Sequence, residues 1–358
     1  MGKRWLVLLF ALLISSGARA ATILETRESL ITARLSAVTL EQSRWLRATL
    51  APGSRAGTLE TPVIAQAAFD RAVVSWNVLT PAGASLEIAV RARIGSRWTR
   101  YYRVARWSSD PRLERRSFAG ERDADGFLDT DTLKLTRLGN AVQIRVTLEA
   151  GAAPPTLTRL AVTSFSSRTA YRAAPTVSDR RAWGVDIAVP VRSQMIYPYG
   201  GEVWCSPTTM TMLLEFWGAR LGRPLADSVP AAVSAIWDPV YDGGGNWSLN
   251  TAYAGGKGLQ AYVDRLSSLV AAEAYIRRGV PLVVSIAWKL GELRGAKLPR
   301  SNGHVLLLRG FTKSGDPITN DPAGKTESAR DILTVYSRAE FERAWFGHSG
   351  GVAYVIGP

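Results

Sequence analysis

The sequence predicts a two-domain protein in which an all-β sandwich is followed by an α+β domain. In the first half, several short stretches alternate apolar and polar residues, as strands with one buried face do. In the second half, an amphipathic helix pattern precedes continuous apolar runs that suit buried central strands. Residues 166–182 are rich in Ser, Arg and Ala and have no apolar period, so we expect a linker there. The predicted domains are residues 21–165 and 183–358.

The strand pattern of the first domain begins near Phe69. Turn signals such as Thr-Pro-Ala-Gly at residues 80–83 separate the alternating stretches, which favours a sandwich. Trp76, Trp98 and Trp107 are interpreted as core aromatics, with a carbohydrate-stacking face as the alternative. The strand candidates are residues 72–78, 86–94, 98–107, 142–148 and 160–165.

The second domain combines helix and strand signals. From Cys205 to Trp217, apolar residues recur at spacings of three and four, which predicts an amphipathic helix that ends at Gly218. Further helices are expected at residues 259–269, 271–278 and 341–346, and strands at residues 280–288, 304–311 and 351–356.

Residues 1–20 have the pattern of a cleaved signal peptide. Lys3 and Arg4 precede an apolar stretch at residues 5–14, and Ala18 and Ala20 fit the small-residue cleavage site. A membrane anchor needs about 20 apolar residues, and no stretch of this chain reaches that length. We therefore expect an exported protein, periplasmic or secreted, without a membrane span.

The chain is strongly basic, with a formal net charge of +14. Because the protein is expected outside the cytoplasm, nucleic acid is not an expected partner. Acidic envelope polymers or an acidic partner fit the charge, and a role in solubility fits it equally. The sequence gives no indication of an oligomeric state.

Cys205 is the only cysteine in the chain, so it cannot form an internal disulfide. It stands at the predicted start of a helix, where unpaired N–H groups and the helix dipole stabilise a thiolate. Pro207 supports this placement, because proline is favoured in the first helical turn. A free thiol has a pKa of about 8.5, so a nearby histidine would also be needed to hold the thiolate at neutral pH.

His304 is the candidate partner, at the start of a predicted strand and directly after Gly303. A third group should orient the imidazole ring. Asp321 is the candidate, because residues 316–320 would pair beside the His304 strand as a hairpin. Asn320 is the alternative orienting residue. Acyl transfer also needs donors for an oxyanion, and we expect the Cys205 N–H and the Gln194 side chain to supply them.

Four motifs make residues 186–358 resemble the peptidase C39-like family, a group of papain-like cysteine peptidases. They are Val-Pro-x-x-Ser-Gln ending at Gln194, Trp-Cys-Ser-Pro-Thr at residues 204–208, Gly-His at residues 303–304 and Asn-Asp-Pro at residues 320–322. Many members of the family have Gly where this chain has Ser206.

The resemblance implies a papain-like α+β fold and a role for each matching residue. It implies Cys205 as nucleophile, His304 as general base and acid, and Asp321 as orienting residue, with Gln194 in the oxyanion hole. Residues 245–250 are also similar to a segment of exported relatives. We expect Trp204, Trp247 and Asn250 to contact the substrate.

Other chemistries are excluded by spacing and order. Residues 347–351 match the nucleophile-elbow pattern, but a helix is expected before them and no acid or histidine follows, so the elbow is rejected. One cysteine and two distant histidines lack metal-ligand spacing, and no dinucleotide or P-loop pattern is present, so no cofactor is expected.

The sequence therefore predicts an exported cysteine peptidase or amidase that cleaves a peptide or peptidoglycan-type amide through an acyl-enzyme. Two alternatives stay open. One is an acyltransferase that passes the acyl group to an amine. The other is an inactive envelope-binding protein whose second domain serves as a scaffold.

Overall fold

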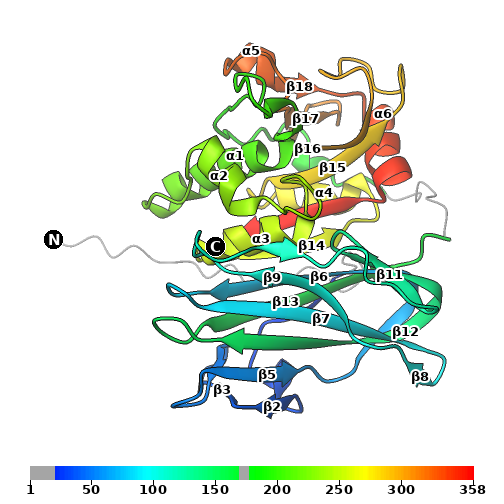
Figure 1. Cartoon of the computed structure of the whole chain (residues 1–358). Coiled ribbons are helices and arrows are strands. Elements are labelled where there is room, and N and C mark those ends of the chain that lie inside the picture. The colour runs from blue at the N-terminus through cyan, green and yellow to red at the C-terminus, as the bar shows by residue number, and fades with distance from the viewer. Residues whose placement is uncertain (1–20, 169–176) are drawn as a thin grey trace.

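The computed structural model describes residues 21–168 and 177–358. The expected signal peptide at residues 1–20 and the middle of the expected linker, residues 169–176, lie outside the described residues. The N-terminal half is a large β-sheet region, and the C-terminal half is a mixed α/β region that stands on it (Figure 1). In the described parts of the chain, no helix has both the length and the apolar character needed to cross a membrane.

The N-terminal region is almost entirely strand. Its thirteen strands are β1(Ala21–Leu24), β2(Arg34–Ser36), β3(Val38–Leu40), β4(Ala48–Leu50), β5(Ala56–Glu60), β6(Ile64–Leu79), β7(Ser85–Ile94), β8(Arg97–Trp98), β9(Tyr102–Trp107), β10(Arg116–Ser117), β11(Gly126–Asp129), β12(Thr132–Glu149) and β13(Thr156–Phe165), with one short helix, η1(Glu28–Leu30). The expected alternating strands are present, and residues 98–107 are divided between β8 and β9.

Hydrogen bonds join these strands into one continuous sheet instead of the two separate sheets of the predicted sandwich. Strand β12 is the reason, because it pairs with β6 and β11 near its start and with β7 and β5 near its end. Its register shifts around Gly139, where a Cβ would lie 2.9 Å from the Phe69 ring. A glycine at this bulge lets the strand approach the core closely as it changes partner.

The tryptophans of this region are divided between core and surface. Trp76 and Trp107 are fully buried, so they are core aromatics, as expected. Trp98 is half-buried, and the guanidinium groups of Arg91 and Arg93 lie over its ring. These stacked cations cover the ring that a sugar would otherwise contact.

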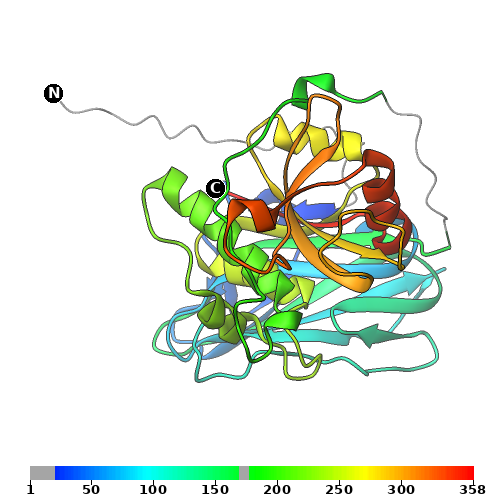
Figure 2. The same cartoon turned by 90° about the horizontal axis from the view of Figure 1, so that it is seen from above.

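The C-terminal region contains a six-stranded antiparallel sheet in the order β14-β19-β15-β16-β17-β18. Helices surround this sheet (Figure 2). The strands are β14(Gln260–Arg265), β15(Leu282–Trp288), β16(Ser301–Phe311), β17(Pro317–Asn320), β18(Leu333–Val335) and β19(Val352–Gly357). The helices are η2(Arg180–Ala182), η3(Gly201–Val203), α1(Cys205–Leu221), α2(Val229–Ile236), α3(Trp247–Gly256), α4(Leu269–Ile276), α5(Ala329–Ile332), α6(Arg338–Glu342) and η4(Arg343–His348).

Two predicted helices differ from the observed elements. The predicted helix at residues 259–269 was wrong, because residues 260–265 form strand β14, paired with β19. Residues 261–264 are all buried, and a short run buried on both faces cannot be told from a helix by periodicity. Helix α1 continues beyond Gly218 to Leu221 and ends at Gly222, whose φ of 65° is the left-handed conformation of a helix C-cap.

Strand β14 is an edge strand of the small sheet, and side chains of the large sheet close its free edge. The Asn77 side chain makes two hydrogen bonds with the Ala261 backbone, donating to O at 2.8 Å and accepting from N at 3.0 Å. The Val263 backbone is paired in the same way, with Ser75 accepting its N–H at 3.1 Å and Thr163 donating to its O at 2.6 Å. Polar side chains therefore replace a seventh strand and fix the two halves together.

We expect Asn77→Ala to lower the free energy of unfolding by about 3 kcal/mol, because it leaves a buried N–H and C=O of Ala261 without partners. Urea denaturation measures this loss. Asn140→Ala is the matched control, because that exposed side chain bonds only within the large sheet, and its cost should stay below about 0.5 kcal/mol. Equal costs for the two variants would contradict the importance of the β14 edge.

Candidate active site

Helix α1 begins at Cys205 and places its thiol at the helix N-terminus. No side chain caps this end, because the N-cap residue is Trp204. The N–H groups of the first turn are therefore open toward the thiol, and the Ser206 N–H interacts with it. As a residue Cys205 is half-buried, and it lines a cleft.

Strands β16 and β17 bring a histidine and a carboxylate together. His304 lies on β16, and Asp321 directly follows β17, which pairs antiparallel with β16. His304 Nε2 lies 2.8 Å from Asp321 Oδ1, and both side chains are buried, with exposures of 2% and 1%. Because Nε2 faces Asp321, Nδ1 is the ring nitrogen available to the thiol of Cys205, with which the imidazole is hydrogen-bonded.

A buried hydrogen bond fastens the helix that carries Cys205 to the strand that carries His304. Thr209, one turn after Cys205, donates its hydroxyl to the backbone O of Val305 at 3.1 Å. The Val305 N–H also interacts with the Cys205 thiol. The distance between nucleophile and imidazole is therefore set by contacts between α1 and β16 themselves.

Charge interactions at this site outweigh burial. Burial is the largest influence on Cys205 and favours the neutral thiol, but His304 and the N–H groups of Val305 and Ser206 lower the pKa of Cys205 overall. Burial likewise opposes the charged imidazole, but Asp321 and Cys205 raise the pKa of His304 to about 10. Both shifts favour a thiolate paired with an imidazolium over the neutral thiol and imidazole.

Asp321 is held in its ionised form by two further donors. The Ala323 N–H donates to its Oδ1 at 2.9 Å, and the Tyr336 hydroxyl donates to its Oδ2 at 2.8 Å. Burial acts against them, but together with His304 they lower the pKa of Asp321. Tyr336 was not a predicted site residue, because no motif surrounds it and it reaches Asp321 only through the pairing of β17 with β18.

Asn320, the alternative orienting residue, points elsewhere. Its side-chain O accepts a hydrogen bond from Arg309 at 3.1 Å, and its N donates to the backbone O of Pro190 at 3.0 Å. Asp321 therefore makes the contact with His304. Trp288 is a second neighbour that sequence reasoning missed. Its ring lies edge-to-face with the His304 ring, with centroids 5.8 Å apart.

Gln194 lies in a loop that is tied to the segment after Asp321. Its backbone N–H donates to the O of Pro322 at 2.8 Å, and its side chain is buried. The side-chain N donates to the O of Gly201 at 2.8 Å, and the side-chain O has no hydrogen-bond partner among the described residues. The structure thus pairs the Gln194 amide with the loop before α1.

A cleft of about 610 Å³ opens over Cys205 and His304. Of the three residues expected to contact substrate, Trp247 lines this cleft. Trp204 does not line it and instead packs against Tyr197, with ring centroids 5.4 Å apart. Gly303 also lines the cleft, and a Cβ there would meet nothing within 4 Å, so close approach to a neighbour does not explain this glycine.

Asn250 has a structural position instead of the predicted substrate contact. It is fully buried because the first turns of α3 direct it toward the interior, away from the cleft. Its side-chain O accepts a hydrogen bond from the Ser206 hydroxyl at 2.8 Å, and Ser206 also lies 3.2 Å from the Tyr354 hydroxyl. The Ser206 side chain therefore points away from the thiol, and its hydroxyl has partners in the interior.

The rejected nucleophile elbow lies at the rim of the same cleft. His348 ends η4 and pairs with Glu292 at 3.0 Å, and strand β19 follows. This order of helix then strand is the reverse of an elbow, as expected. In the described part of the chain, no group of three or more His, Cys, Asp or Glu residues could hold a metal ion.

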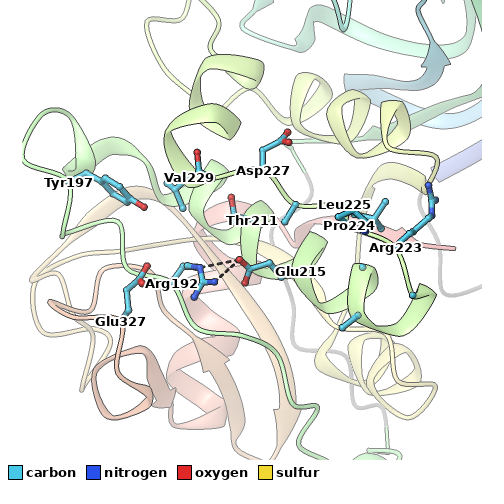
Figure 3. A pocket seen from close by; sticks show the side chains of 15 residues that line it. Arg192, Tyr197, Thr211, Glu215, Arg223, Pro224, Leu225, Asp227, Val229 and Glu327 are labelled. Carbon is cyan, nitrogen blue, oxygen red and sulfur yellow. Dashed lines mark hydrogen bonds and ion pairs between the residues drawn. The ribbon is translucent and has the colours of Figure 1, made fainter.

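A larger cavity, about 830 Å³, lies along the C-terminal half of α1 and contains neither Cys205 nor His304. Figure 3 shows Arg192 paired with Glu215 at its centre, with Nη2 and Oε1 2.7 Å apart. Its wall holds no cysteine or histidine, so it cannot supply a thiol–imidazole pair. The smaller cleft is therefore the candidate active site.

Family comparisons agree with this geometry. A model described as Peptidase C39 like family matches residues 186–351, and one described as Peptidase C39 N-terminal domain matches residues 22–165. The chain belongs to the peptidase C39-like family. The resemblance inferred from its motifs is thereby confirmed, and the second half has a papain-like cysteine peptidase type of fold.

Solved structures add little to the family assignment. One similar structure is TmCBM61 in complex with β-1,4-galactotriose, at 9% identity and a TM-score of 0.22, covering 40% of this chain and 88% of that one. Another is the CBM22-1–GH10 modules of Clostridium thermocellum xylanase 10B with xylohexaose, at 12% identity and a TM-score of 0.22, covering 47% and 30%. Such TM-scores carry no argument. No curated protein matches this C39-like chain significantly.

We expect Tyr336→Phe to destabilise the protein by about 1–2 kcal/mol at neutral pH, because Asp321 loses a buried donor. The stability that ionised Asp321 contributes is present above about pH 3.9 and is lost as pH falls through its lower folded pKa. Removing the hydroxyl raises that folded pKa, so the variant should begin to lose this contribution at a higher pH than the wild type does.

Urea midpoints measured from pH 3 to pH 7 test this expectation. Tyr101→Phe is the control, because the buried Tyr101 hydroxyl has no hydrogen-bond partner among the described residues. Tyr101→Phe should leave the urea midpoint unchanged or slightly higher, and the midpoint should depend on pH as it does in the wild type. A Tyr336→Phe profile parallel to the wild-type curve would show that Tyr336 does not act on Asp321.

Proposed function

We propose that this protein is a cysteine peptidase or amidase with Cys205 as nucleophile, His304 as general base and acid, and Asp321 as orienting residue. The observation that carries the proposal is the continuous contact from thiol to imidazole to carboxylate at the base of one cleft. Each group has the environment that its role needs: a helix N-terminus for the thiolate, burial for the ring, and three donors for the carboxylate.

The reaction follows from the charges of the resting site. The Cys205 thiolate attacks the amide carbon, and the carbonyl oxygen becomes an oxyanion near the first-turn N–H groups of α1. The His304 imidazolium gives its Nδ1 proton to the leaving amine, and an acyl-enzyme remains. The neutral imidazole then takes a proton from water, the hydroxide attacks the acyl carbon, and the acid leaves while the thiolate and imidazolium re-form.

Gln194 is the proposed side-chain donor to the oxyanion. Its amide nitrogen carries two hydrogens, and the hydrogen bond to Gly201 uses one of them. Gly201 lies four residues before Cys205, so the amide is held beside the loop that leads to the nucleophile. Gln194→Ala would then lower turnover by about 10²-fold while Cys205 keeps its reactive thiolate.

The proposed substrate is a peptide or a peptidoglycan-type amide. The cleft wall offers the aromatic rings of Trp247 and Tyr241 for packing, and the carboxylates of Glu202 and Asp242 for positively charged groups. The leader pattern at residues 1–20 supports export, so the proposed location is the periplasm or the exterior. The net charge of +14, which becomes +11 when Lys3, Arg4 and Arg19 are lost with residues 1–20, suits acidic envelope polymers as further partners.

Alkylation of Cys205 with iodoacetamide across pH tests the thiolate–imidazolium pair. We expect the wild-type rate to reach its plateau well below the free-thiol pKa of about 8.5, since the pKa of Cys205 is lowered. His304→Ala should move the profile to pH 8.5 or above, about tenfold slower at pH 7 for each unit of pKa gained. Cys205→Ala should take up no label.

His348→Ala is the matched control, because His348 lines the same cleft but pairs with Glu292. Its profile should match the wild type. An ordinary thiol profile in the wild type, unchanged by His304→Ala, would leave an inactive scaffold as the better description. For an active protein, product analysis with an added amine separates hydrolysis from acyl transfer, because only a transferase gives the new amide.

A further inference from the structure

Asp131 belongs to the large sheet, yet its carboxylate caps a helix of the small domain. It lies in the two-residue turn between β11 and β12 and is 5% exposed. Its Oδ2 accepts the backbone N–H of Trp247, the first residue of α3, at 2.6 Å, and the Ser248 N–H also interacts with the carboxylate. The Thr132 hydroxyl donates to Oδ1 at 3.0 Å.

Helix α3 therefore has two caps from different parts of the chain. Its own N-cap, Asn246, accepts the Leu249 N–H at 3.1 Å. Asp131 satisfies N–H groups that Asn246 does not reach, and it brings negative charge to the positive end of the helix dipole. Burial is the larger influence and raises the pKa of Asp131 to about 6. Burying an ionised carboxylate lowers the free energy of unfolding unless hydrogen bonds compensate for the lost hydration, as the bonds to α3 do in part here.

The turn that carries Asp131 is strained. Thr130 has a φ of 54°, in the left-handed region that β-branched residues rarely adopt. In a two-residue hairpin turn, glycine is the residue that takes positive φ without cost. Contacts around the turn must stabilise this Thr130 conformation. The turn contacts the C-terminal domain through the hydrogen bonds from α3 to Asp131.

From α3, hydrogen bonds lead directly to the cleft wall and to the start of α1. The Asn250 side-chain N donates to the backbone O of Gly244 at 2.8 Å and of Asn246 at 2.7 Å. Its O accepts the Ser206 hydroxyl, next to Cys205. Residues 243–245 and Trp247, which we name the glycine wall, line the same cleft as His304.

We propose that Asp131 is a positioning residue of the active site, which holds the glycine wall at the distance that a peptide substrate needs. The inference rests on the proposed function, and it assigns part of the cleft's precision to the N-terminal domain. Asp131 touches no reacting atom. It acts through the Trp247 N–H and the start of α3, so its loss would loosen substrate binding while the Cys205–His304 pair stays intact.

Two thiol probes of different size test the proposal on the full-length protein. Iodoacetamide is small and reports the thiolate, whereas a peptidyl epoxide must fit the cleft. In Asp131→Ala we expect the epoxide's apparent dissociation constant to rise roughly tenfold, with the maximal rate within about twofold of the wild type. The iodoacetamide rate should not change. Asp131→Asn, whose side-chain O can still accept from Trp247, should restore most of the epoxide affinity.

Amide hydrogen exchange of residues 243–250 gives a second measurement that needs no bound ligand. Asp131→Ala should speed exchange there, and Asp131→Asn should reverse it. Ser75→Ala is the matched control, because it removes a buried interdomain hydrogen bond to Val263 without touching α3. It should leave both the epoxide constant and this exchange unchanged.

Three outcomes would overturn the proposal. Asp131→Ala could leave epoxide affinity and exchange as in the wild type, Ser75→Ala could reproduce its effects, or both probes could slow in parallel. Failure of the proposed function looks different, because the wild-type thiol would then show no enhanced reactivity with either probe. In that case hydrogen exchange still decides whether Asp131 holds the wall.

Discussion

The closure of the β14 edge by Asn77, Ser75 and Thr163 fixes the small sheet to the large one. An edge strand with open N–H and C=O groups invites pairing with another chain, and here side chains of another sheet fill that position. Helix α3 lies against β6 and β14, and its first residue is held separately by Asp131 of the large sheet. The N-terminal region is thus part of the support of the site, although a separate family model describes it.

The centre of the cleft keeps charges in a place where burial alone would neutralise them. His304 and Asp321 are almost completely buried, and such pairs contribute little net stability compared with well-packed apolar residues. The two charged side chains are tolerated because both oxygens of the Asp321 carboxylate accept hydrogen bonds. The His304 ring is also hydrogen-bonded to the Cys205 thiol. A stability cost concentrated at one cleft is typical of residues kept for chemistry.

Sequence reasoning succeeded where the signal is local and failed where contacts come from distant segments. The hairpin after β16 can be predicted from spacing, so the sequence alone predicts Asp321 as the partner of His304. Strand β14 was missed because burial on both faces removes the alternation that marks a strand. Tyr336 and Trp288 have no motif, and Asp131 acts across domains, so only the folded chain reveals them. Asn250 was expected to contact substrate, but it is fully buried and does not line the cleft.

The presence of a single cysteine, at the start of α1, has a practical consequence for quantification. A thiol reagent can label at most one cysteine per molecule. The labelling stoichiometry therefore gives the fraction of molecules whose Cys205 is reduced and reactive. Burst labelling can therefore serve as an active-site titration before any substrate is known. Specific activities could then be normalised to competent protein rather than to total protein, which separates poor catalysis from partial inactivation by oxidation of the same sulfur.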